Sequence, residues 1–303
     1  MNSRILVSGV SGPIGAALLP SLRTSGWSVV RLVRGSAAGA GQVAWDPAAP
    51  LAPDAVSGFD AVIHLAGESI VGRWTAAKKA KIRESRVAGT LNLASALAQA
   101  EEKPKVFVCG SAIGYYGDRG DEVMREESAP GTGFLAEVCR EWEEAATPAV
   151  QAGIRTAHIR TGIVLSPKGG ALGAMLAPFK LGLGGRTGDG RQWMSWIDVQ
   201  DMVGGIHHIL RNEVMQGAVN MVAPKPVRNA EFVSTLAGVL SRPAIFPMPG
   251  FVVKAMFGEM GEELLLSGQK VEAGKLISSG YLFRYGELRE SLEGLLKSQT
   301  GQS

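Results

Sequence analysis

Three regularly spaced glycines follow the first apolar segment of the chain, and they restrict its fold more than any other feature. Gly9, Gly12 and Gly15 form a Gly-x-x-Gly-x-x-Gly pattern between an expected strand at 4–8 and an expected helix at 14–25. Glycine here permits a positive φ in a tight turn and leaves room for a diphosphate beside the helix N-terminus. The pattern therefore predicts a dinucleotide-binding turn made of Gly9, Ser11, Gly12, Pro13, Ile14 and Gly15. The alternative is a glycine-rich turn that only packs the helix against the strand.

Short apolar segments alternate with longer amphipathic ones, which indicates βαβ units and a parallel sheet. Strands are expected at 4–8, 29–33, 61–65, 106–109, 156–164 and 219–222, and helices at 14–25, 76–99, 134–152, 199–211, 230–240 and 287–297. The sequence therefore predicts an α/β fold with a Rossmann-type doubly wound parallel sheet. We expect a Rossmann domain at 1–165, with its sheet completed by about 195–223. From Ser166 the chain is glycine-rich and irregular, so 166–303 is expected to form a smaller C-terminal substrate region.

The end of the second expected strand carries a basic residue where an acidic residue would favour NAD. Val33 and Arg34 stand there. A guanidinium binds a ribose 2′-phosphate in a fork geometry, whereas a carboxylate would repel it. We therefore expect NADP(H) as the cofactor, with Arg34 on the phosphate and Arg31 as the second choice. The alternative is a solvent-facing arginine at a strand end.

Small residues end the third expected strand. Leu65 and Ala66 are expected to contact the adenosine side of the cofactor, with Gly67 in the exit turn and His64 packed at the strand end. Arg86 falls on an apolar stripe of the next helix, so its charge needs an anionic partner or a route to water. A cofactor phosphate or ribose would be such a partner, and extension of the side chain to solvent is the alternative.

A polar, aromatic loop follows the fourth expected strand. In doubly wound folds such strand ends border the ligand crevice. Ser111, Tyr115 and Tyr116 are therefore the candidate catalytic residues, which would hydrogen-bond the nicotinamide end or a substrate hydroxyl. The alternative is local turn bonding by Ser111 and packing by the two tyrosines.

These motifs resemble those of an extended short-chain dehydrogenase/reductase of the sugar-nucleotide epimerase type, and more closely an atypical branch often called the epimerase family. The resemblance covers essentially the whole chain. It rests on Ser85-Arg86, Gly114-Tyr-Tyr-Gly-Asp, Phe134-Leu-Ala-Glu-Val-Cys, Arg160-Thr-Gly-Ile-Val-Leu, Gly190-Arg-Gln-Trp-Met-Ser-Trp-Ile and Val227-Arg-Asn-Ala-Glu-Phe, together with the glycine pattern. It implies the Rossmann fold and a C-terminal region that contacts substrate.

The chain departs from this family's pattern at the proton-transfer residues. Typical members carry a Tyr-x-x-x-Lys pair that opens the helix after the serine loop, and those positions are Leu135 and Cys139 here. The usual asparagine on the preceding helix is Arg86. The usual catalytic serine falls on Ala112 or its neighbour Ser111. Cys139 is expected to pack in the core.

The glycine-rich segment 182–191 lacks the Gly-Lys-Ser/Thr of a P-loop. By the resemblance it leads into a substrate-side loop, with Arg186, Arg191 and Gln192 as ligands for an anionic or hydroxylated molecule. Trp193 and Trp196 either stack on a ring or pack.

Two hypotheses of function follow. The first is an NADP(H)-dependent oxidoreductase or epimerase-like enzyme that acts on a small polar substrate, with or without a linked nucleotide. In this hypothesis Ser111 polarises a carbonyl and Tyr115 or Tyr116 donates the proton. The second is a non-catalytic NADP(H)-binding sensor or scaffold, which the missing Tyr-x-x-x-Lys pair favours.

The amino-acid composition limits which binding partners and which cellular compartment we expect. The 303 residues include 31 Lys+Arg and 28 Asp+Glu, a net charge of +3 that is too small and dispersed to indicate a nucleic-acid or membrane surface. The two cysteines, Cys109 and Cys139, have no metal-site or disulfide spacing. The glycines and Pro13 argue against a secretory signal in the apolar N-terminal stretch. We expect a cytoplasmic protein with a small-molecule substrate and a homodimer through helices 76–99 and 134–152.

Overall fold

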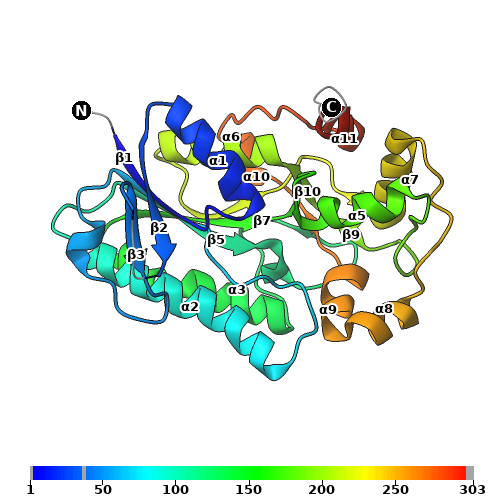
Figure 1. The fold of residues 1–303 in the computed structure, drawn as a ribbon, viewed down its shortest axis with the longest axis horizontal. Coiled ribbons are helices and arrows are strands. Elements are labelled where there is room, and N and C mark those ends of the chain that lie inside the picture. The colour runs from blue at the N-terminus through cyan, green and yellow to red at the C-terminus, as the bar shows by residue number, and fades with distance from the viewer. Residues whose placement is uncertain (1–2, 36–38, 298–303) are drawn as a thin grey trace.

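A parallel sheet forms the centre of the molecule (Figure 1). The computed structural model describes residues 3–35 and 39–297. Within them, seven strands lie in the order β11-β7-β5-β4-β1-β2-β3, each parallel to its neighbours. Their bounds are β1 Arg4–Ser8, β2 Ser28–Arg34, β3 Gln42–Trp45, β4 Ala61–His64, β5 Val106–Ala112, β7 Arg155–Thr161 and β11 Gly217–Met221. This order confirms the predicted doubly wound α/β fold.

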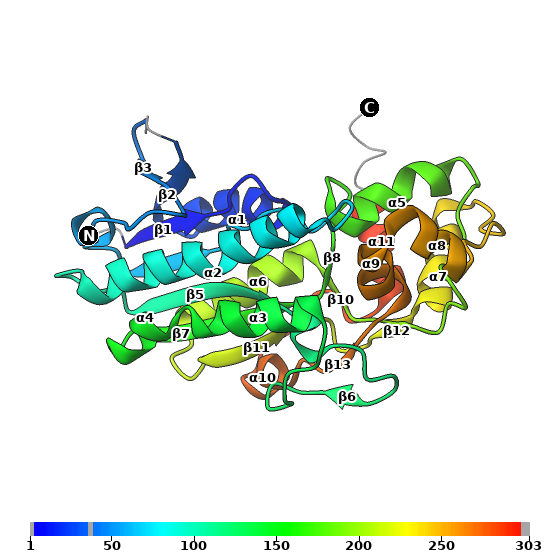
Figure 2. The same ribbon diagram turned by 90° about the horizontal axis from the view of Figure 1, so that it is seen from below.

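Helices cover both faces of the sheet, as Figures 1 and 2 show. Helices α1 (Pro13–Thr24) and α6 (Val199–Arg211) pack on one face. Helices α2 (Ala76–Gln99), α3 (Phe134–Glu144) and α4 (Thr147–Gln151) pack on the other. Because both faces are buried, β1, β4 and β5 consist mostly of apolar residues, whereas β7 carries several polar ones.

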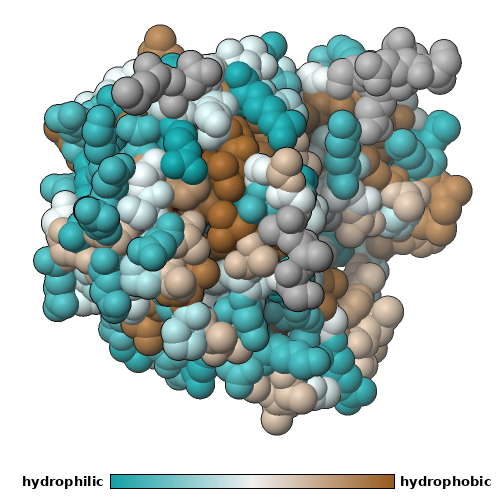
Figure 3. All heavy atoms as spheres, turned by 60° about the vertical axis from the view of Figure 1, so that its left-hand side comes forward, coloured by the Kyte–Doolittle hydropathy of each residue, from teal (hydrophilic) through white to brown (hydrophobic). Residues whose placement is uncertain are grey.

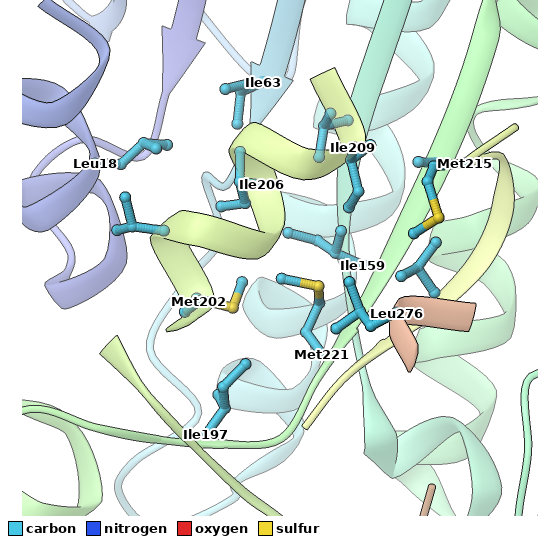
Figure 4. Packing of buried hydrophobic residues seen from close by; sticks show 14 of the residues in the cluster. Leu18, Ile63, Ile159, Ile197, Met202, Ile206, Ile209, Met215, Met221 and Leu276 are labelled. Carbon is cyan, nitrogen blue, oxygen red and sulfur yellow. The ribbon is translucent and has the colours of Figure 1, made fainter. Parts of the chain in front are cut away.

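The core on the α1/α6 face is built from branched aliphatic side chains and methionines (Figure 4). Ile206 of α6 lies at the centre of this view, between Leu18 of α1 and Ile159 of β7. All three side chains are fully buried. This packing holds the carboxyl ends of the strands in fixed positions, and those ends carry the candidate site.

A smaller C-terminal lobe lies at the end of the molecule away from β3 (Figures 1 and 2). Its helices are α5 Gly170–Lys180, α7 Asn229–Leu240, α8 Gly250–Phe257, α9 Glu259–Gly261 and α11 Leu288–Lys297, with a π-helical turn η3 at Glu262–Leu266. A separate hydrophobic cluster joins α5, α7 and α11. Strands β9 (Trp193–Met194) and β12 (Val227–Arg228) form a short antiparallel ladder beside it.

Short elements connect the lobe with the sheet region. Strand β6 (Val123–Met124) pairs with β13 (Lys270–Val271), and α10 (Gly274–Ser278) follows β13. Turns η1 (Pro53–Val56) and η2 (Ile113–Tyr116) follow β3 and β5. The chain thus returns from the lobe to the sheet region after residue 266.

The predicted strand at 156–164 is wrong as a single element. Strand β7 ends at Thr161, and β8 (Ile163–Leu165) leaves the main sheet to pair with β10 (Trp196–Asp198). Gly162 lies at the break, where an added Cβ would stand 2.4 Å from the Ser195 carbonyl oxygen. A close backbone approach, invisible in the apolar pattern, therefore bends the chain here.

The predicted helix at 134–152 is also wrong as a single element. Helix α3 ends at Glu144 and α4 begins at Thr147, with Pro148 in its first turn. Proline has no N–H to continue the helical hydrogen bonds, so it favours a new helix start at this place. Strand β3 and helices α5 and α8 were not predicted.

No helix of the described residues combines the length and apolar character that crossing a bilayer requires. On the face seen in Figure 3, hydrophilic side chains cover much of the surface and surround smaller hydrophobic areas.

Candidate functional site

The first and third glycines of the opening turn are fixed by close backbone contacts. Gly9 has φ +72°, and an added Cβ would stand 2.4 Å from the carbonyl carbon of Leu65. At Gly15 an added Cβ would stand 2.5 Å from the Gly9 carbonyl oxygen. These two glycines therefore let β1, α1 and the end of β4 approach one another.

Gly12 is different, because the space beside it is open. Its φ is −75°, and an added Cβ would make only an ordinary contact, 3.6 Å from the Gly9 carbonyl oxygen. Gly12 is the N-cap of α1, with Pro13 following, no side-chain cap and no acidic residue in the first turn. Ser11 and Pro13 are exposed and Ile14 is half-buried. The turn therefore leaves the first N–H groups of α1, at its positive end, available to an anion.

Arg34 lies where the sequence analysis expects it. It is the last residue of β2 and is exposed, next to half-buried Val33. Arg31 lies within β2, where it pairs in register with Val7 of β1. Arg34 thus offers its guanidinium at the carboxyl edge of the sheet, one strand away from the glycine turn.

Arg86 lies against the loop that follows β4. Its Nη1 donates hydrogen bonds to the carbonyl oxygens of Glu68 (2.9 Å) and Ile82 (3.2 Å). An added Cβ at Gly67 would stand 3.2 Å from the guanidinium carbon, which also lies 5.1 Å from the centre of a Trp142 ring. Burial lowers the pKa of Arg86. The arginine thus reaches the backbone beside Leu65–Gly67, and its role toward a cofactor stays a prediction.

Ser111 lies within β5 rather than in a loop, and its side chain is 4% exposed. Its hydroxyl donates a hydrogen bond to Glu143 Oε1 at 2.7 Å. Arg160 of β7 binds the same carboxylate through two bonds of 2.8 Å, Nε to Oε1 and Nη2 to Oε2. Ser111 is therefore oriented by a nearly buried ion pair.

The two tyrosines have different surroundings. Tyr116 is fully buried, donates to Asn220 Oδ1 at 2.6 Å and accepts from Arg160 Nη1 at 3.0 Å. Burial raises the pKa of Tyr116 to about 12. Tyr115 is half-buried, and its ring centre lies 3.5 Å from the Arg160 guanidinium carbon. The geometry gives Tyr116 a packing position and leaves Tyr115 as the tyrosine nearer the surface.

Leu135 and Cys139 lie beneath the turn that carries the tyrosines. An added Cβ at Gly114 would stand 3.3 Å from Leu135 Cβ and 3.9 Å from Cys139 Sγ. Burial raises the pKa of the Cys139 thiol to about 12. Met260 and Phe134 belong to a hydrophobic cluster against which Leu135 packs. Apolar packing thus fills the place where the family's tyrosine and lysine stand.

The substrate-side residues expected in the C-terminal region fall into two groups. Arg186 and Arg191 are exposed. Gln192 donates through Nε2 to the carbonyl oxygens of Thr187 (3.0 Å) and Leu265 (2.7 Å), so its amide is engaged in holding the loop.

The remaining candidates pack within the fold. Trp196 is fully buried, whereas Trp193 is half-buried with its ring 3.9 Å from the Arg228 guanidinium carbon. His64 is fully buried, and its Nδ1 lies 2.7 Å from Ser8 Oγ.

Glu143 and Arg160 were missed as a pair in the sequence analysis. A signal was present, because Arg160 falls within a predicted buried strand, where its charge needs an acidic partner. Nothing in the spacing identified Glu143 as that partner, since the contact joins β7 to α3.

Comparison with known proteins agrees with this geometry. Residues 5–221 match the model of the NAD dependent epimerase/dehydratase family, and residues 248–295 match a domain of unknown function, DUF1731. The chain belongs to the NAD dependent epimerase/dehydratase family, and its site is that of a Rossmann-type dinucleotide-binding protein.

Relatives of epimerase type cover nearly the whole chain. The epimerase family protein Mb2239 of Mycobacterium bovis is 39% identical over 293 residues, which is 96% of this chain and 97% of the relative. The crystal structure of human epimerase family protein SDR39U1 with NADPH is similar at a TM-score of 0.89 and 35% identity, covering 97% of this chain and 99% of the human one.

A second solved structure is a nucleoside-diphosphate sugar epimerase from Corynebacterium glutamicum. It has a TM-score of 0.80 and 35% identity, covering 97% of this chain and 58% of that chain. Similarity over 96–97% of this chain confirms the resemblance to the epimerase family.

Proposed function

We propose that the chain is an NADP(H)-dependent oxidoreductase or epimerase-like enzyme acting on a small polar substrate. The observation that carries the proposal is Arg34, an exposed cation at the end of β2 where an acidic residue would favour NAD. The human relative solved with NADPH supports the same cofactor.

The residues of the turn fit such a cofactor, because Gly12 leaves open the space that an added Cβ would enter. Gly12 and the first turn of α1 would bind the diphosphate, and Arg34 would bind the 2′-phosphate. Leu65–Gly67 would line the adenosine side, and Arg86 would hold a ribose or phosphate oxygen. When bound, NADPH supplies a hydride to a carbonyl carbon.

Proton transfer falls to Tyr115 in this proposal. Tyr115 follows the end of β5 and is half-buried, whereas the Tyr116 hydroxyl is held between Asn220 and Arg160. Ser111 would polarise the substrate carbonyl by turning toward it the hydroxyl proton that it donates to Glu143 Oε1 in this structure. The name of the Corynebacterium glutamicum relative supports a nucleotide-linked sugar as the substrate.

Titration of the protein with NADPH and with NADH tests the cofactor. We expect tighter binding of NADPH, and we expect Arg34→Ala to weaken NADPH binding while leaving NADH binding nearly unchanged. Arg23→Ala, which removes a charge from the opposite end of α1, is the matched control. Equal affinities of the wild type for the two dinucleotides would refute the assignment of Arg34.

The second candidate function is a non-catalytic NADP(H) sensor or scaffold. It is favoured by the presence of Leu135 and Cys139 where typical members carry the Tyr-x-x-x-Lys pair, since these two residues cannot transfer a proton as that pair does. NADPH absorbance followed with sugar nucleotides and carbonyl metabolites separates the two. Turnover that falls in Tyr115→Phe supports the enzyme, whereas tight NADPH binding without oxidation supports the sensor.

A further inference from the structure

Exposed apolar side chains gather at one end of the C-terminal lobe. Twelve large apolar side chains of the described residues are exposed, and six of them lie in two short stretches, 181–183 and 245–256. We call these six the apolar tip: Leu181 (75% exposed), Leu183 (57%), Ile245 (71%), Phe246 (55%), Phe251 (75%) and Met256 (60%). Scattered exposed apolar residues are ordinary, but a concentration of this kind indicates an interaction surface.

Backbone contacts bring the two stretches together. Phe246 N donates to the Gly184 carbonyl oxygen (3.2 Å), and Arg242 Nε donates to the Lys180 carbonyl oxygen (3.0 Å). An added Cβ at Gly182 would stand 3.4 Å from Pro243. The loop after α5 and the loop before α8 therefore run side by side, at the end of the molecule where Figures 1 and 2 place both helices.

The two chain segments that carry the tip contain only basic charged residues. Segments 166–188 and 232–258 contain five basic residues and no aspartate or glutamate. Lys254 pairs with Glu262. Lys180, Arg186 and Arg242 have no carboxylate within ion-pair distance among the described residues. Arg242 and Lys180, which the hydrogen bond between them holds together, thus place two positive charges beside the apolar tip.

We propose that the apolar tip docks the protein peripherally on an anionic lipid surface. Leucine, isoleucine and phenylalanine would enter the boundary between headgroups and acyl chains, while Lys180 and Arg242 would contact anionic headgroups. The proposal replaces the expectation, drawn from the net charge of the whole chain, that a membrane surface is not a partner. It is independent of the cofactor and of the proposed reaction.

Two observations favour a lipid surface over other occupants. A second copy docked through the same patch across a twofold axis would set like charges against each other. The apolar side chains come from two adjacent loops and one short helix at an end of the molecule, a placement that suits shallow insertion.

Co-sedimentation with vesicles tests the proposal with the full chain. We expect the wild type to sediment with vesicles of phosphatidylcholine mixed with phosphatidylserine, to remain in solution with phosphatidylcholine alone, and to be released by high salt. Wild type that stays in solution with both vesicles, or that binds both equally, overturns the proposal. A wild-type dimer that Leu181→Ser/Phe251→Ser dissociates, without vesicle binding, overturns it in favour of a second copy.

Substitutions in the apolar tip test whether the tip makes the contact with the vesicle. Leu181→Ser/Phe251→Ser should lower the vesicle partition coefficient by at least about tenfold. Lys180→Gln/Arg242→Gln should lower it by about fivefold per charge. Val214→Ser/Leu282→Ser is the matched control, because both residues are as exposed as the tip residues (74% and 89%) but lie outside the tip. An equal loss in the control would contradict the assignment.

Discussion

Gly12→Ala separates the binding role of the glycine turn from its structural role. The Gly12 backbone has φ −75° and ψ 166°, which alanine adopts without strain, and the added Cβ meets the Gly9 carbonyl oxygen at an ordinary 3.6 Å. The protein should therefore accept the methyl group, whereas a dinucleotide diphosphate beside α1 would collide with it.

The expected change in stability is small because two effects oppose each other. Alanine is less favourable than glycine as an N-cap by roughly 1 kcal/mol. Replacing glycine by alanine at a compatible φ also restricts the unfolded chain, which stabilises the protein by about 0.4–1 kcal/mol. The free energy of unfolding should therefore change by less than about 1 kcal/mol.

The expected change in cofactor affinity is large. A displaced diphosphate loses at least one charge-assisted hydrogen bond to the helix N-terminus, worth about 1.5–3 kcal/mol, so the Kd for NADPH should rise about tenfold to a hundredfold. Urea unfolding and a fluorescence titration with NADPH measure the two quantities on the same protein.

Gly15→Ala is the matched control. Its added Cβ would stand 2.5 Å from the Gly9 carbonyl oxygen and 2.6 Å from Val10 Cα, so backbone must move. Stability should fall by roughly 1–3 kcal/mol. Unchanged NADPH affinity in Gly12→Ala would refute the placement of the diphosphate over the start of α1.

Three further predictions concern buried and half-buried polar groups. Arg160→Met and Glu143→Gln should each lower the free energy of unfolding by about 3–5 kcal/mol, because each leaves one charged partner of the ion pair alone. The double variant should lose far less than the sum of the two single losses. Additive losses in urea unfolding would contradict this. Burial lowers the pKa of His64 from 6.5 to about 4. Between these values the unfolded chain binds more protons, so the free energy of unfolding should fall by about 3 kcal/mol from pH 7 to pH 4, and His64→Gln should remove that part of the slope. Glu263 accepts hydrogen bonds of 3.2 Å from the N–H groups of Phe134 and Leu135. Glu263→Ala should therefore cost about 1 kcal/mol of stability, and an unchanged thermal midpoint would count against this cap.

The elements that sequence analysis predicted well are those whose local pattern decides their structure. Strand β1 and helices α2 and α6 have the predicted bounds, because apolar periodicity and the flanking residues determine them locally. The break at Gly162 depends instead on the Ser195 carbonyl oxygen, a contact across 33 positions. Such a contact leaves no trace in a local pattern.

In the candidate site too, the residues placed by a local sequence pattern were predicted, and those placed by tertiary contacts were not. Gly9, Gly15 and Arg34 lie where the strand–turn–helix pattern places them. Ser111 was expected in a loop, but β5 continues to Ala112 and turns its hydroxyl toward Glu143. The length of β5 is decided by its pairing with β7, which reaches as far as Ala112 and Thr161. That pairing is tertiary and cannot be read from residues 106–112 alone.

Strand β11, which completes the central sheet, comes after α5 of the C-terminal lobe and before α7 of the same lobe. The chain therefore passes several times between the sheet region and the lobe. Helix α10 packs beside β11, and α11 then returns to the lobe. Neither half is a contiguous stretch of polypeptide, so no single cut separates the sheet from the lobe. A truncation between residues 165 and 217 removes the edge strand β11 together with α7, α8 and α11 of the lobe.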